Sequence, residues 1–594
     1  MDSALQASIQ EWLRLDKNDA TINEIKDLVA RTDIYELEKR MRKRIEFGTA
    51  GLRGKMEAGW SRMNDLTVIQ ASQGLCAYVS STIPDAVKRG IVIGHDHRHN
   101  SQRWATLVSM VFLNNGFKVY LYRKLVHTPL VPFGIKKLGA ACGVMITASH
   151  NPKQDNGYKV YWSNAVQIIS PHDSEIAKAI EENLEPKSWD TNVVNESTLG
   201  TDVTEAIENS YFESLTQLCQ TPTENGISDV LFVNTSMHGV GHPFARRAFQ
   251  TFNLQPFHAV ELQQEPDPEF STVSFPNPEE KGALDLAIKK ADEIGAKYIL
   301  AQDPDADRFS AAEKNSNGEW TIFTGDQLGT IFAANCFQRY LASGKPIEKL
   351  AMVASTVSSK MIEAIAEKEG FKFVETLTGF KYIGNKALEL CDEGFEVPFG
   401  YEEAIGFMLN SDIRDKDGVS AAAFFAEIAV NLAKNNSSVA IQLKELYSKY
   451  GYFETANSYF LCEDPVTINK IFAKLRSYDK GIPERQGNYP KSIAGLEVTS
   501  VKDLTVGYDS TNPPTFKPNL PLSSGHMIQF KATSKSDDTR INLTIRTSGT
   551  EPKIKFYLEG CGKNSSAVRS ILPDVVKELR DTWMDAKENG LKSP

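Results

Sequence analysis

The chain has 594 residues, of which 41% are hydrophobic and 24% charged, and its 66 basic and 76 acidic residues leave a net charge of −10. This length corresponds to about four domains of roughly 150 residues each, and the apolar fraction is sufficient for several buried cores. The acidic balance argues against nucleic-acid binding as the main function, because a phosphate backbone is usually met by a basic surface. We therefore expect no nucleic-acid partner.

The cysteines and the lengths of the apolar segments indicate in which cellular compartment the protein is expected. The seven cysteines are scattered and include no Cys-x-x-Cys pair, so we expect neither a disulfide framework nor a zinc site. The N-terminus lacks the basic and apolar segments of a signal peptide, and no apolar run approaches the ~18 residues that span a bilayer. These features predict a cytoplasmic protein without a membrane partner.

The predicted elements begin with a helical extension, in which Leu5, Ile9 and Trp12 share one helix face. From Phe47 onward, short apolar strands alternate with amphipathic helices, a pattern typical of βαβ units and of mixed, largely parallel sheets. The expected strands cover residues 90–94, 118–122, 140–146, 229–233, 297–300, 350–354 and 396–399.

The strand spacing predicts three α/β domains in series. The last part of the chain differs, with a proline-rich loop, strand-like runs at 541–545 and 553–557 and a closing helix at about 565–589, and this predicts a smaller α+β domain. The expected parts are a helical extension at 1–46, α/β domains at 47–215, 216–325 and 326–455, and an α+β domain at 456–594.

A candidate nucleophile lies in Thr147-Ala-Ser-His-Asn-Pro152, directly after a predicted strand. In open α/β sheets, ligands bind beyond the carboxyl ends of the strands. The hydroxyl of Ser149 needs a base or a neighbouring charge to act as a nucleophile, and His150 and Lys159 are close in sequence. The alternative for this motif alone is a simple polar turn.

A candidate metal loop follows the strand at 297–300, with carboxylates at Asp303, Asp305 and Asp307. Three carboxylates at alternate positions are hard oxygen ligands for a divalent cation, and they leave room for a substrate oxygen, which suits Mg²⁺. The alternatives are a solvated acidic loop or a calcium site. The glycine and the final glutamate of an EF-hand loop are missing at their usual offsets.

Two further motifs suggest sugar and phosphate binding. Glu402 and Glu403 lie between Gly400 and Gly406 and could accept hydrogen bonds from sugar hydroxyls, although acidic residues at a helix N-terminus explain them equally well. The segment Arg546-Thr-Ser-Gly-Thr550 combines an arginine, hydroxyl groups and free backbone N–H groups into a possible phosphate cradle. Its alternative is a β-hairpin turn with an exposed arginine.

Three histidines alternate at His95, His97 and His99. Alternate residues share a strand face, but no further ligand cluster accompanies them. We expect no metal there, and we expect the neighbouring Arg98 to have an electrostatic role.

Together, and in this order, the four motifs resemble those of the α-D-phosphohexomutase superfamily over most of the chain, from Phe47 to about Gly560. The resemblance implies four domains around a central cleft, three related α/β mixed-sheet domains and a C-terminal α+β domain. It identifies the motifs as the phosphoserine loop at 147–152, the metal loop at 303–308, the sugar-binding loop at 400–406 and the phosphate-binding loop at 546–550.

Within the superfamily, the chain resembles the phosphopentomutase branch. The helical extension, the segment 48–54 and Thr378-Gly-Phe-Lys381 carry this resemblance. The classical phosphoglucomutase branch usually has a serine after the paired glutamates, and Ala404 stands there in this chain. The missing hydroxyl argues against a strict preference for glucose.

The resemblance implies a mutase that moves phosphate between the 1-position and the 5- or 6-position of a pentose or hexose. Ser149 would carry the phosphoryl group, and Lys159 would be the general acid/base with His150 and Lys416 as supporting cations. Mg²⁺ would be held by a phosphoserine oxygen and the three aspartates. The other implied residues are Arg53 and Arg308 for phosphate oxygens, and Thr378, Gly379, Lys381, Glu402, Glu403, Arg546, Ser548, Gly549 and Thr550 for the substrate.

The implied partners are small-molecule sugar phosphates, with glucose 1,6-bisphosphate or another sugar bisphosphate as activator, and we expect a monomer. Three other functions stay open at this point. A glucose 1,6-bisphosphate synthase would use the same residues with another phosphate donor. A hydrolytic phosphatase and a sugar-phosphate-binding protein without catalysis are the remaining alternatives.

Overall fold

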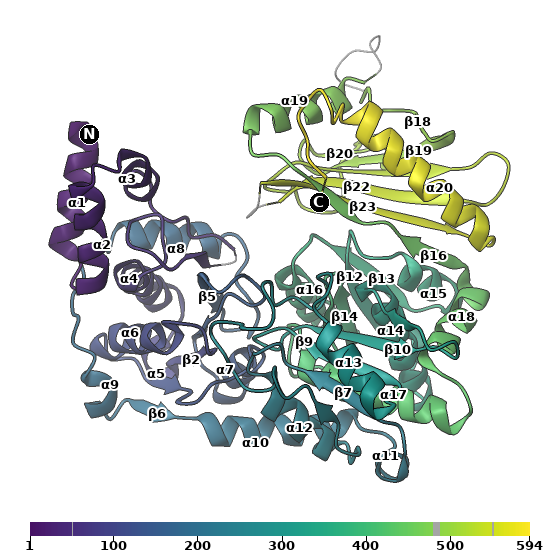
Figure 1. The fold of residues 1–594 in the computed structure, drawn as a ribbon, viewed down its shortest axis with the longest axis horizontal. Helices are drawn as coiled ribbons and strands as arrows, with labels where there is room; N and C mark the ends of the chain where they lie inside the picture. The colour runs from purple at the N-terminus through teal and green to yellow at the C-terminus, as the bar shows by residue number, and fades with distance from the viewer. Residues whose placement is uncertain (50, 479–486, 549–551, 594) are drawn as a thin grey trace. The chain divides into compact units, whose positions relative to one another are not determined.

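The structure is a computed structural model that describes residues 1–49, 51–478, 487–548 and 552–593 (Figure 1). The chain divides into two units, which are described separately. The first unit comprises residues 1–345, 349–353 and 379–439, and the second comprises 346–348, 354–378 and 440–594.

The N-terminal extension consists of three helices, and its apolar faces form a core with the start of the next segment. Asp2, Asn18 and Asp33 accept hydrogen bonds from backbone N–H groups at the helix starts, as N-cap residues do. Trp12 packs edge-on against Trp60, with ring centroids 4.9 Å apart. The helices are α1 (Ser3–Leu15), α2 (Asp19–Ala30) and α3 (Ile34–Met41).

The first sheet of the first unit has six strands in the order β1-β5-β4-β2-β3-β6. β2 pairs in parallel with β3 and β4, and β3 with β6, whereas β5 pairs antiparallel with β4 and β1. Every residue of β2 and β4 is buried, as expected for strands covered on both faces. The strands are β1 (Leu52–Lys55), β2 (Ile91–His95), β3 (Val119–Leu121), β4 (Cys142–Ile146), β5 (Asp155–Tyr161) and β6 (Gly200–Asp202).

Helices follow most of these strands, as the βαβ pattern predicts. They are α4 (Asp65–Thr82), α5 (Ala86–Arg89), α6 (Ser101–Asn114), α7 (Leu130–Leu138), α8 (His172–Glu181), α9 (Val193–Glu196) and α10 (Thr204–Leu215), followed by the 3₁₀ turn η1 (Thr216–Leu218). The predicted phosphoserine loop connects β4 to β5.

The second sheet has five strands in the order β11-β10-β9-β7-β8. β7 pairs in parallel with β8 and β9, and β9, β10 and β11 form an antiparallel run. The predicted metal loop is the connection between β9 and β10. The elements are α11 (Pro222–Ile227), β7 (Phe232–Thr235), α12 (Gly241–Thr251), β8 (His258–Ala259), α13 (Asp285–Ile294), β9 (Tyr298–Gln302), β10 (Phe309–Lys314) and β11 (Trp320–Ile322).

The remainder of the first unit contains the predicted sugar-binding loop, which is the turn between the antiparallel strands β14 and β15. A Cβ at Gly406 would lie 2.3 Å from the Cδ atom of Lys416, so a larger residue there would displace this lysine side chain. The elements are α14 (Gly325–Ala342), α16 (Phe380–Asp392), β14 (Glu396–Glu402), β15 (Gly406–Met408) and α17 (Gly418–Lys434).

The second unit is built on a sheet of antiparallel strand pairs, with the order β16-β23-β22-β21-β19-β18. Helix α20 packs against β23 of this sheet (Figure 1). The strands are β16 (Tyr452–Thr455), β17 (Ser458–Leu461), β18 (Ser492–Ile493), β19 (Leu496–Asp503), β20 (Tyr508–Asp509), β21 (Met527–Thr533), β22 (Arg540–Thr547) and β23 (Lys553–Gly562).

The closing helix ends earlier than the sequence predicted, at Glu578 and not at about residue 589. Helix α20 (Ser565–Glu578) gives way to a single π turn, Leu579–Trp583. The Trp583 side chain is fully buried in the core of this unit, and Asp585 then adopts a positive φ of 43°, so the chain turns away from the helix axis before residue 589.

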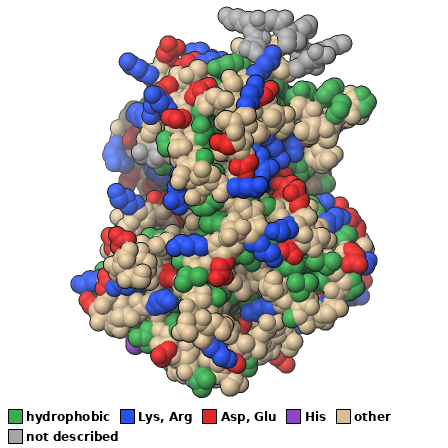
Figure 2. All heavy atoms as spheres, turned by 90° about the vertical axis from the view of Figure 1, so that its right-hand side faces the viewer, with side chains coloured by type: hydrophobic (Ala, Val, Ile, Leu, Met, Phe, Trp, Pro, Cys, Tyr) green, Lys and Arg blue, Asp and Glu red, His purple; other side chains and the backbone are tan. Residues whose placement is uncertain are grey.

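The other elements of this part of the chain are η2 (Ile347–Lys349), β12 (Leu350–Ser355), α15 (Met361–Glu369), β13 (Lys372–Thr376), α18 (Val439–Tyr450) and α19 (Pro465–Arg476). On the face drawn in Figure 2, basic and acidic side chains are interspersed, which is typical of a solvated surface.

Across the described residues, we find no helix that combines the length and the hydrophobicity of a membrane span.

Candidate functional site

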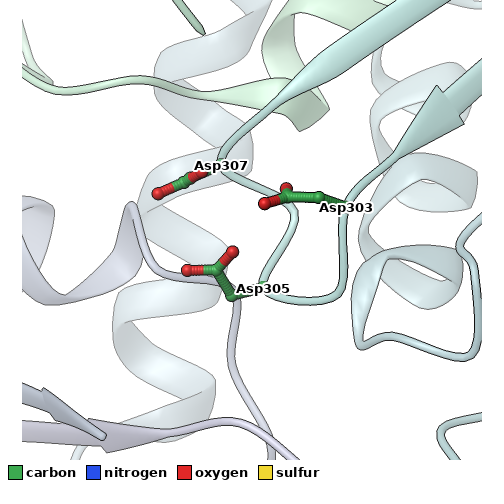
Figure 3. Close-up of side chains that lie close together, drawn as sticks. All are labelled: Asp303, Asp305 and Asp307. Carbon is green, nitrogen blue, oxygen red and sulfur yellow. The ribbon is translucent and has the colours of Figure 1, made fainter. Parts of the chain in front are cut away.

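Three buried carboxylates converge in the loop between β9 and β10. Asp303, Asp305 and Asp307 are at most 1% exposed, and one oxygen of each lies within 4.8 Å of the others (Figure 3). Between them, Ala306 adopts a positive φ of 51°. The alternation predicted from the sequence therefore directs all three side chains to one point.

Two lysines from other segments contact these carboxylates. Lys159, on β5, places its Nζ atom 2.8 Å from Asp305 Oδ2 and 3.0 Å from Asp307 Oδ2. Lys416, in the loop before α17, lies 3.4 Å from Asp307 Oδ2. Burial opposes the charged form of both lysines, but the carboxylates outweigh it and raise the pKa of each. Both lysines are therefore ammonium ions at neutral pH.

The carboxylates retain capacity for a divalent cation. Burial, together with the charges of Asp305 and Asp307, raises the pKa of Asp303 well above its usual range. Burial also opposes ionisation of Asp305, but Lys159 outweighs it and lowers the pKa of that group. The Oδ1 atoms of Asp305 and Asp307 are buried and have no hydrogen-bond partner among the described residues. Three close carboxylates, two of them with such an oxygen, fit a hard cation such as Mg²⁺.

Ser149 reaches this cluster from the loop after β4. Its hydroxyl donates a hydrogen bond to Asp303 Oδ2 at 2.7 Å, although the two residues are 154 positions apart. Its backbone has a positive φ of 53°, an uncommon conformation for a residue other than glycine. The Ser149 N–H donates to Thr147 Oγ1 at 2.9 Å. The predicted nucleophile and the predicted metal ligands therefore form one site.

His150 lies beside the serine, with Nδ1 3.3 Å from Ser149 Oγ. Burial, followed by the charges of Arg308 and Arg53, lowers the pKa of His150 well below 6.5. This direction favours the neutral imidazole as a hydrogen-bonding partner of Ser149. The expected role of His150 as a supporting cation, like that of Lys416, stays a prediction.

The two predicted phosphate-steering arginines also lie here. Arg53, on β1, donates a long hydrogen bond of 3.4 Å to Asn151 Oδ1, and burial lowers its pKa. The Arg308 N–H donates to Asp303 Oδ1 at 3.0 Å. Burial opposes the charge of Arg308, but Asp303 and Asp307 outweigh it and raise its pKa.

The predicted sugar-binding glutamates follow β14. Glu402 is buried, and burial raises its pKa even though Lys416 and Arg308 act in the opposite direction. Glu403 follows in the turn and is partly exposed. Lys416 contributes to the charge around both Asp307 and Glu402, so the sugar-binding loop and the aspartate cluster share one cation.

Lys381 and Gly379 mark the start of α16. Gly379 has a positive φ of 111° and precedes the helix. The Lys381 ammonium contacts Thr49 Oγ1. Burial lowers the pKa of Lys381 to about 8, although Asp173 and Glu402 act in the opposite direction.

The remaining predicted substrate residues belong to the second unit. Arg546, on β22, donates to Tyr557 Oη at 3.0 Å and lies 5.5 Å from the centroid of that ring. The Ser548 N–H donates to the Lys553 carbonyl at 3.0 Å. Thr378 is also in this unit. Gly549 and Thr550 lie outside the described residues.

Two residues at the site were not among the predicted site residues. Thr128 donates its hydroxyl to Asp305 Oδ2 at 2.5 Å, and its only sequence signal is a polar position after a predicted strand. Arg98, for which we expected only an electrostatic role, contacts the phosphoserine loop directly. The flanking histidines have other contacts: His95 Nδ1 lies 2.9 Å from the Asp96 carbonyl, and His99 Nε2 lies 2.6 Å from Glu269.

Comparisons with known proteins agree with this geometry. Three family models match the chain, the phosphoglucomutase/phosphomannomutase alpha/beta/alpha domains I, II and III, at residues 44–187, 209–318 and 324–450. The expected fold class, three α/β domains followed by a C-terminal α+β region, is confirmed.

Named relatives resemble the chain over nearly its whole length. The phosphopentomutase of Homo sapiens is 47% identical and covers 97% of this chain and 95% of its own length. The glucose 1,6-bisphosphate synthase of Homo sapiens is 43% identical, with 99% and 96% covered. The open form of the phosphoglucomutase parafusin from Paramecium has a TM-score of 0.67 at 20% identity, with 92% and 96% covered, and this likeness concerns the fold alone.

Proposed function

The chain belongs to the phosphoglucomutase/phosphomannomutase family, and from this premise we propose that it is a phosphosugar mutase. It interconverts the 1-phosphate and the 5- or 6-phosphate of a pentose or hexose through a phosphorylated Ser149 and a sugar bisphosphate. One observation carries this proposal. The Ser149 hydroxyl lies 2.7 Å from Asp303, in a buried cluster of three carboxylates and two ammonium groups.

Asp303, Asp305 and Asp307 would hold the divalent cation, for which Mg²⁺ is the proposed identity. A bound cation would neutralise charge on the phosphoryl group during transfer. Their burial and their unpartnered oxygens support this assignment. Glucose 1,6-bisphosphate, or another sugar bisphosphate, is the proposed activator that supplies the first phosphoryl group to Ser149.

Ser149 acts in both directions of the proposed reaction. The free hydroxyl oxygen of the sugar phosphate bonds to the phosphorus, and the bond between phosphorus and Ser149 Oγ breaks. The hydroxyl loses its proton and Ser149 Oγ regains one. Lys159 is the proposed acid/base for these proton transfers, because its raised pKa keeps it protonated and therefore able to supply a proton to the leaving Oγ. Arg53 and Arg308 are proposed to bind phosphate oxygens.

Recognition of the sugar is assigned to Glu402 and Glu403, with Thr378, Gly379 and Lys381 setting its orientation. The second phosphate of the bisphosphate is assigned to the loop that follows β22, namely Arg546, Ser548, Gly549 and Thr550. Because the same phosphate-binding loop must accept either phosphate in turn, the rate of transfer depends more on charge and position than on the identity of the sugar.

The predicted domain boundaries, the cytoplasmic location and the monomeric state remain proposals.

Pentose 1-phosphates, ribose 1-phosphate or deoxyribose 1-phosphate, are the proposed preferred substrates, with glucose 1-phosphate as a slower one. The 47% identity to a phosphopentomutase supports this order. Ala404 is consistent with it, because an alanine offers no hydroxyl to a hexose.

The second candidate is glucose 1,6-bisphosphate synthase, which the 43% identity to such an enzyme favours. It would use the same serine and carboxylates with a different phosphoryl donor. Assay with 1,3-bisphosphoglycerate as donor and glucose 1-phosphate as acceptor separates the two. Formation of glucose 1,6-bisphosphate faster than isomerisation would favour the synthase.

The deciding experiment compares ribose 1-phosphate and glucose 1-phosphate side by side, with Mg²⁺ and catalytic glucose 1,6-bisphosphate. We expect isomerisation of both without release of inorganic phosphate, and a higher kcat/KM for ribose 1-phosphate. Faster glucose turnover would overturn the pentose preference. Phosphate release without isomerisation would indicate a phosphatase, and turnover of neither substrate would refute the mutase.

A further inference from the structure

One buried arginine holds the backbone of the loop that carries Ser149. Arg98, in the segment after β2, donates from Nη2 to the carbonyls of Ser149 and Asn151, both at 2.6 Å. It donates from Nη1 to the carbonyls of Pro152 and Asp155 at 2.9 Å and 3.1 Å. The four hydrogen bonds use all four terminal N–H groups of the guanidinium.

Arg98 is itself fixed from two sides. Its Nε atom lies 3.4 Å from Asp96 Oδ2, and the side chains of both residues are 0% exposed. Asp96 also accepts hydrogen bonds from the Arg98 N–H and from Ser101 Oγ, at 3.0 Å and 2.6 Å. On the other side, the buried ring of Phe270 lies 5.0 Å from the guanidinium carbon.

We propose that Arg98 is a positioning residue for phosphoryl transfer, which holds Ser149 in its left-handed backbone conformation by binding the carbonyls on both sides of the turn. A positive φ is an uncommon and unfavourable conformation for a serine, so it persists only when the surroundings enforce it. Arg98 donates to three carbonyls of this loop, those of Ser149, Asn151 and Pro152, and to the Asp155 carbonyl at the start of β5. The inference rests on the proposed role of Ser149 and deepens it.

The segment before α13 also contacts Arg98 and the residues next to it. Glu269 lies 2.7 Å from Lys153 Nζ and 2.6 Å from His99 Nε2, and Phe270 follows it. The Glu269 contacts are half-exposed and contribute little by themselves. The buried Phe270 is the stronger element, because it contacts Arg98 from the same α/β domain that supplies the three aspartates.

The proposal predicts a specific failure when the arginine is replaced by lysine. An ammonium keeps the charge but has three donors without the planar geometry of a guanidinium, so it cannot bind four carbonyls. Ser149 then leaves the position from which it contacts Asp303. Displacement of a reacting group by about 1 Å costs on the order of 100-fold in rate.

The experiment compares Arg98→Lys with Arg89→Lys as a matched control. Arg89 also donates to two backbone carbonyls of this domain, those of Gly139 and Ala140 at 2.9 Å and 3.0 Å, but it has no contact with the phosphoserine loop. The readouts are kcat and KM, the rate and final extent of Ser149 phosphorylation by glucose 1,6-bisphosphate from intact mass, and amide hydrogen exchange of the peptide 147–155.

For Arg98→Lys, we expect kcat and the phosphorylation rate to fall on the order of 100-fold, with KM little changed and the final extent of phosphorylation still complete. A full final extent shows that the molecules are folded and competent, which a general folding defect would not allow. Exchange of the peptide 147–155 should become faster. Arg89→Lys should behave like the unmodified protein in all readouts.

A wild-type kcat in Arg98→Lys, or unchanged exchange of the peptide 147–155, would overturn the positioning role. An equal loss in Arg89→Lys would also overturn it, because the effect would then be general. If the unmodified protein never accepts phosphate on Ser149, the proposed function fails, and hydrogen exchange of the loop alone then decides whether Arg98 holds it.

Discussion

Lys159 Nζ lies 2.8 Å from Asp305 Oδ2, and this buried ion pair joins two α/β domains across 146 positions of sequence. The same ammonium lies 3.0 Å from Asp307. The carboxylates that are proposed to hold a divalent cation are therefore already neutralised in part by a lysine. A metal ion and Lys159 would neutralise the same two carboxylates, so we expect their contributions to stability to be linked.

Replacing Lys159 with methionine should destabilise the metal-free protein and make it more dependent on Mg²⁺. Loss of one partner of a buried pair typically costs about 3–5 kcal/mol, because the remaining charge stays buried. Thermal unfolding with and without Mg²⁺ measures this linkage. Mg²⁺ should raise the unfolding temperature of Lys159→Met more than that of the unmodified protein.

The matched control is Lys314→Met. Lys314 lies on β10 of the second sheet and forms a partly exposed ion pair with Asp292 of α13. This substitution should change the unfolding temperature little, with the same Mg²⁺ effect as in the unmodified protein. An equal Mg²⁺ effect in Lys159→Met would contradict the shared site.

Replacing Asp305 with asparagine should weaken Mg²⁺ binding by at least about 10-fold, since even partners of metal ligands typically account for 10–100-fold in affinity. The amide retains the shape of the side chain but removes the negative charge. Calorimetric titration with Mg²⁺ gives the affinity directly, without reference to turnover. Asp292→Asn, an exposed substitution in the same domain, should bind Mg²⁺ normally, and an unchanged affinity in Asp305→Asn would refute the ligand assignment.

The affinity for sugar phosphates should depend on pH through Lys381. Burial lowers the pKa of this lysine to about 8, so its ammonium is present below pH 8 and is lost as the pH rises through that value. The attraction for an anionic substrate is lost with it, and KM should increase between pH 7 and pH 9.

The variant Lys381→Arg tests this assignment, because a guanidinium stays charged over the whole range. Its KM should be nearly constant from pH 7 to pH 9. The same increase of KM in Lys381→Arg as in the unmodified protein would assign the pH dependence to another group.

Replacing Arg546 with alanine should raise KM for ribose 1-phosphate and glucose 1-phosphate alike. A hydrogen bond to a charged group contributes about 1.5–3 kcal/mol, which corresponds to roughly 10- to 100-fold in affinity. Steady-state kinetics with both substrates provide the measurement. Arg540→Ala, at the other end of β22, should have no such effect, and a change for one sugar only would argue against a phosphate cradle.

The parts of the site formed by residues close together in the sequence could be predicted, because their geometry depends on local spacing along the chain. Alternation at Asp303, Asp305 and Asp307 predicted that the three side chains converge, and they do. The position of Ser149 after a strand predicted a loop at the carboxyl end of a sheet, and the loop between β4 and β5 confirms it.

Contacts between distant segments could not be predicted in this way. Arg98 stands between His97 and His99 in a pattern that predicted an electrostatic role but no partner. Its four carbonyl contacts depend on where β5 and the turn before it lie in the folded chain. Thr128 reaches Asp305 across 177 positions. The lowered pKa of His150 results from burial and from the charges of Arg308 and Arg53, none of which could be inferred from its own motif.

The closing helix illustrates the limit of periodicity. Helical spacing continued in the sequence to about residue 589, but burial of Trp583 in the core and the positive φ of Asp585 end the helix earlier. Tertiary packing overrode local preference there.

The most direct test of the whole account is the transfer of phosphate to Ser149. The protein and its Ser149→Ala variant are incubated with Mg²⁺ and glucose 1,6-bisphosphate. The phosphorylated residue is then located by peptide mass spectrometry, and isomerisation of ribose 1-phosphate is assayed in the same samples. Ser109→Ala is the control, since this buried serine donates only to the Ala105 carbonyl of its own helix. We expect one phosphate on Ser149 in the unmodified protein and in Ser109→Ala, and neither phosphate nor turnover in a folded Ser149→Ala. Isomerisation by Ser149→Ala, or phosphate on a different residue, would contradict the account.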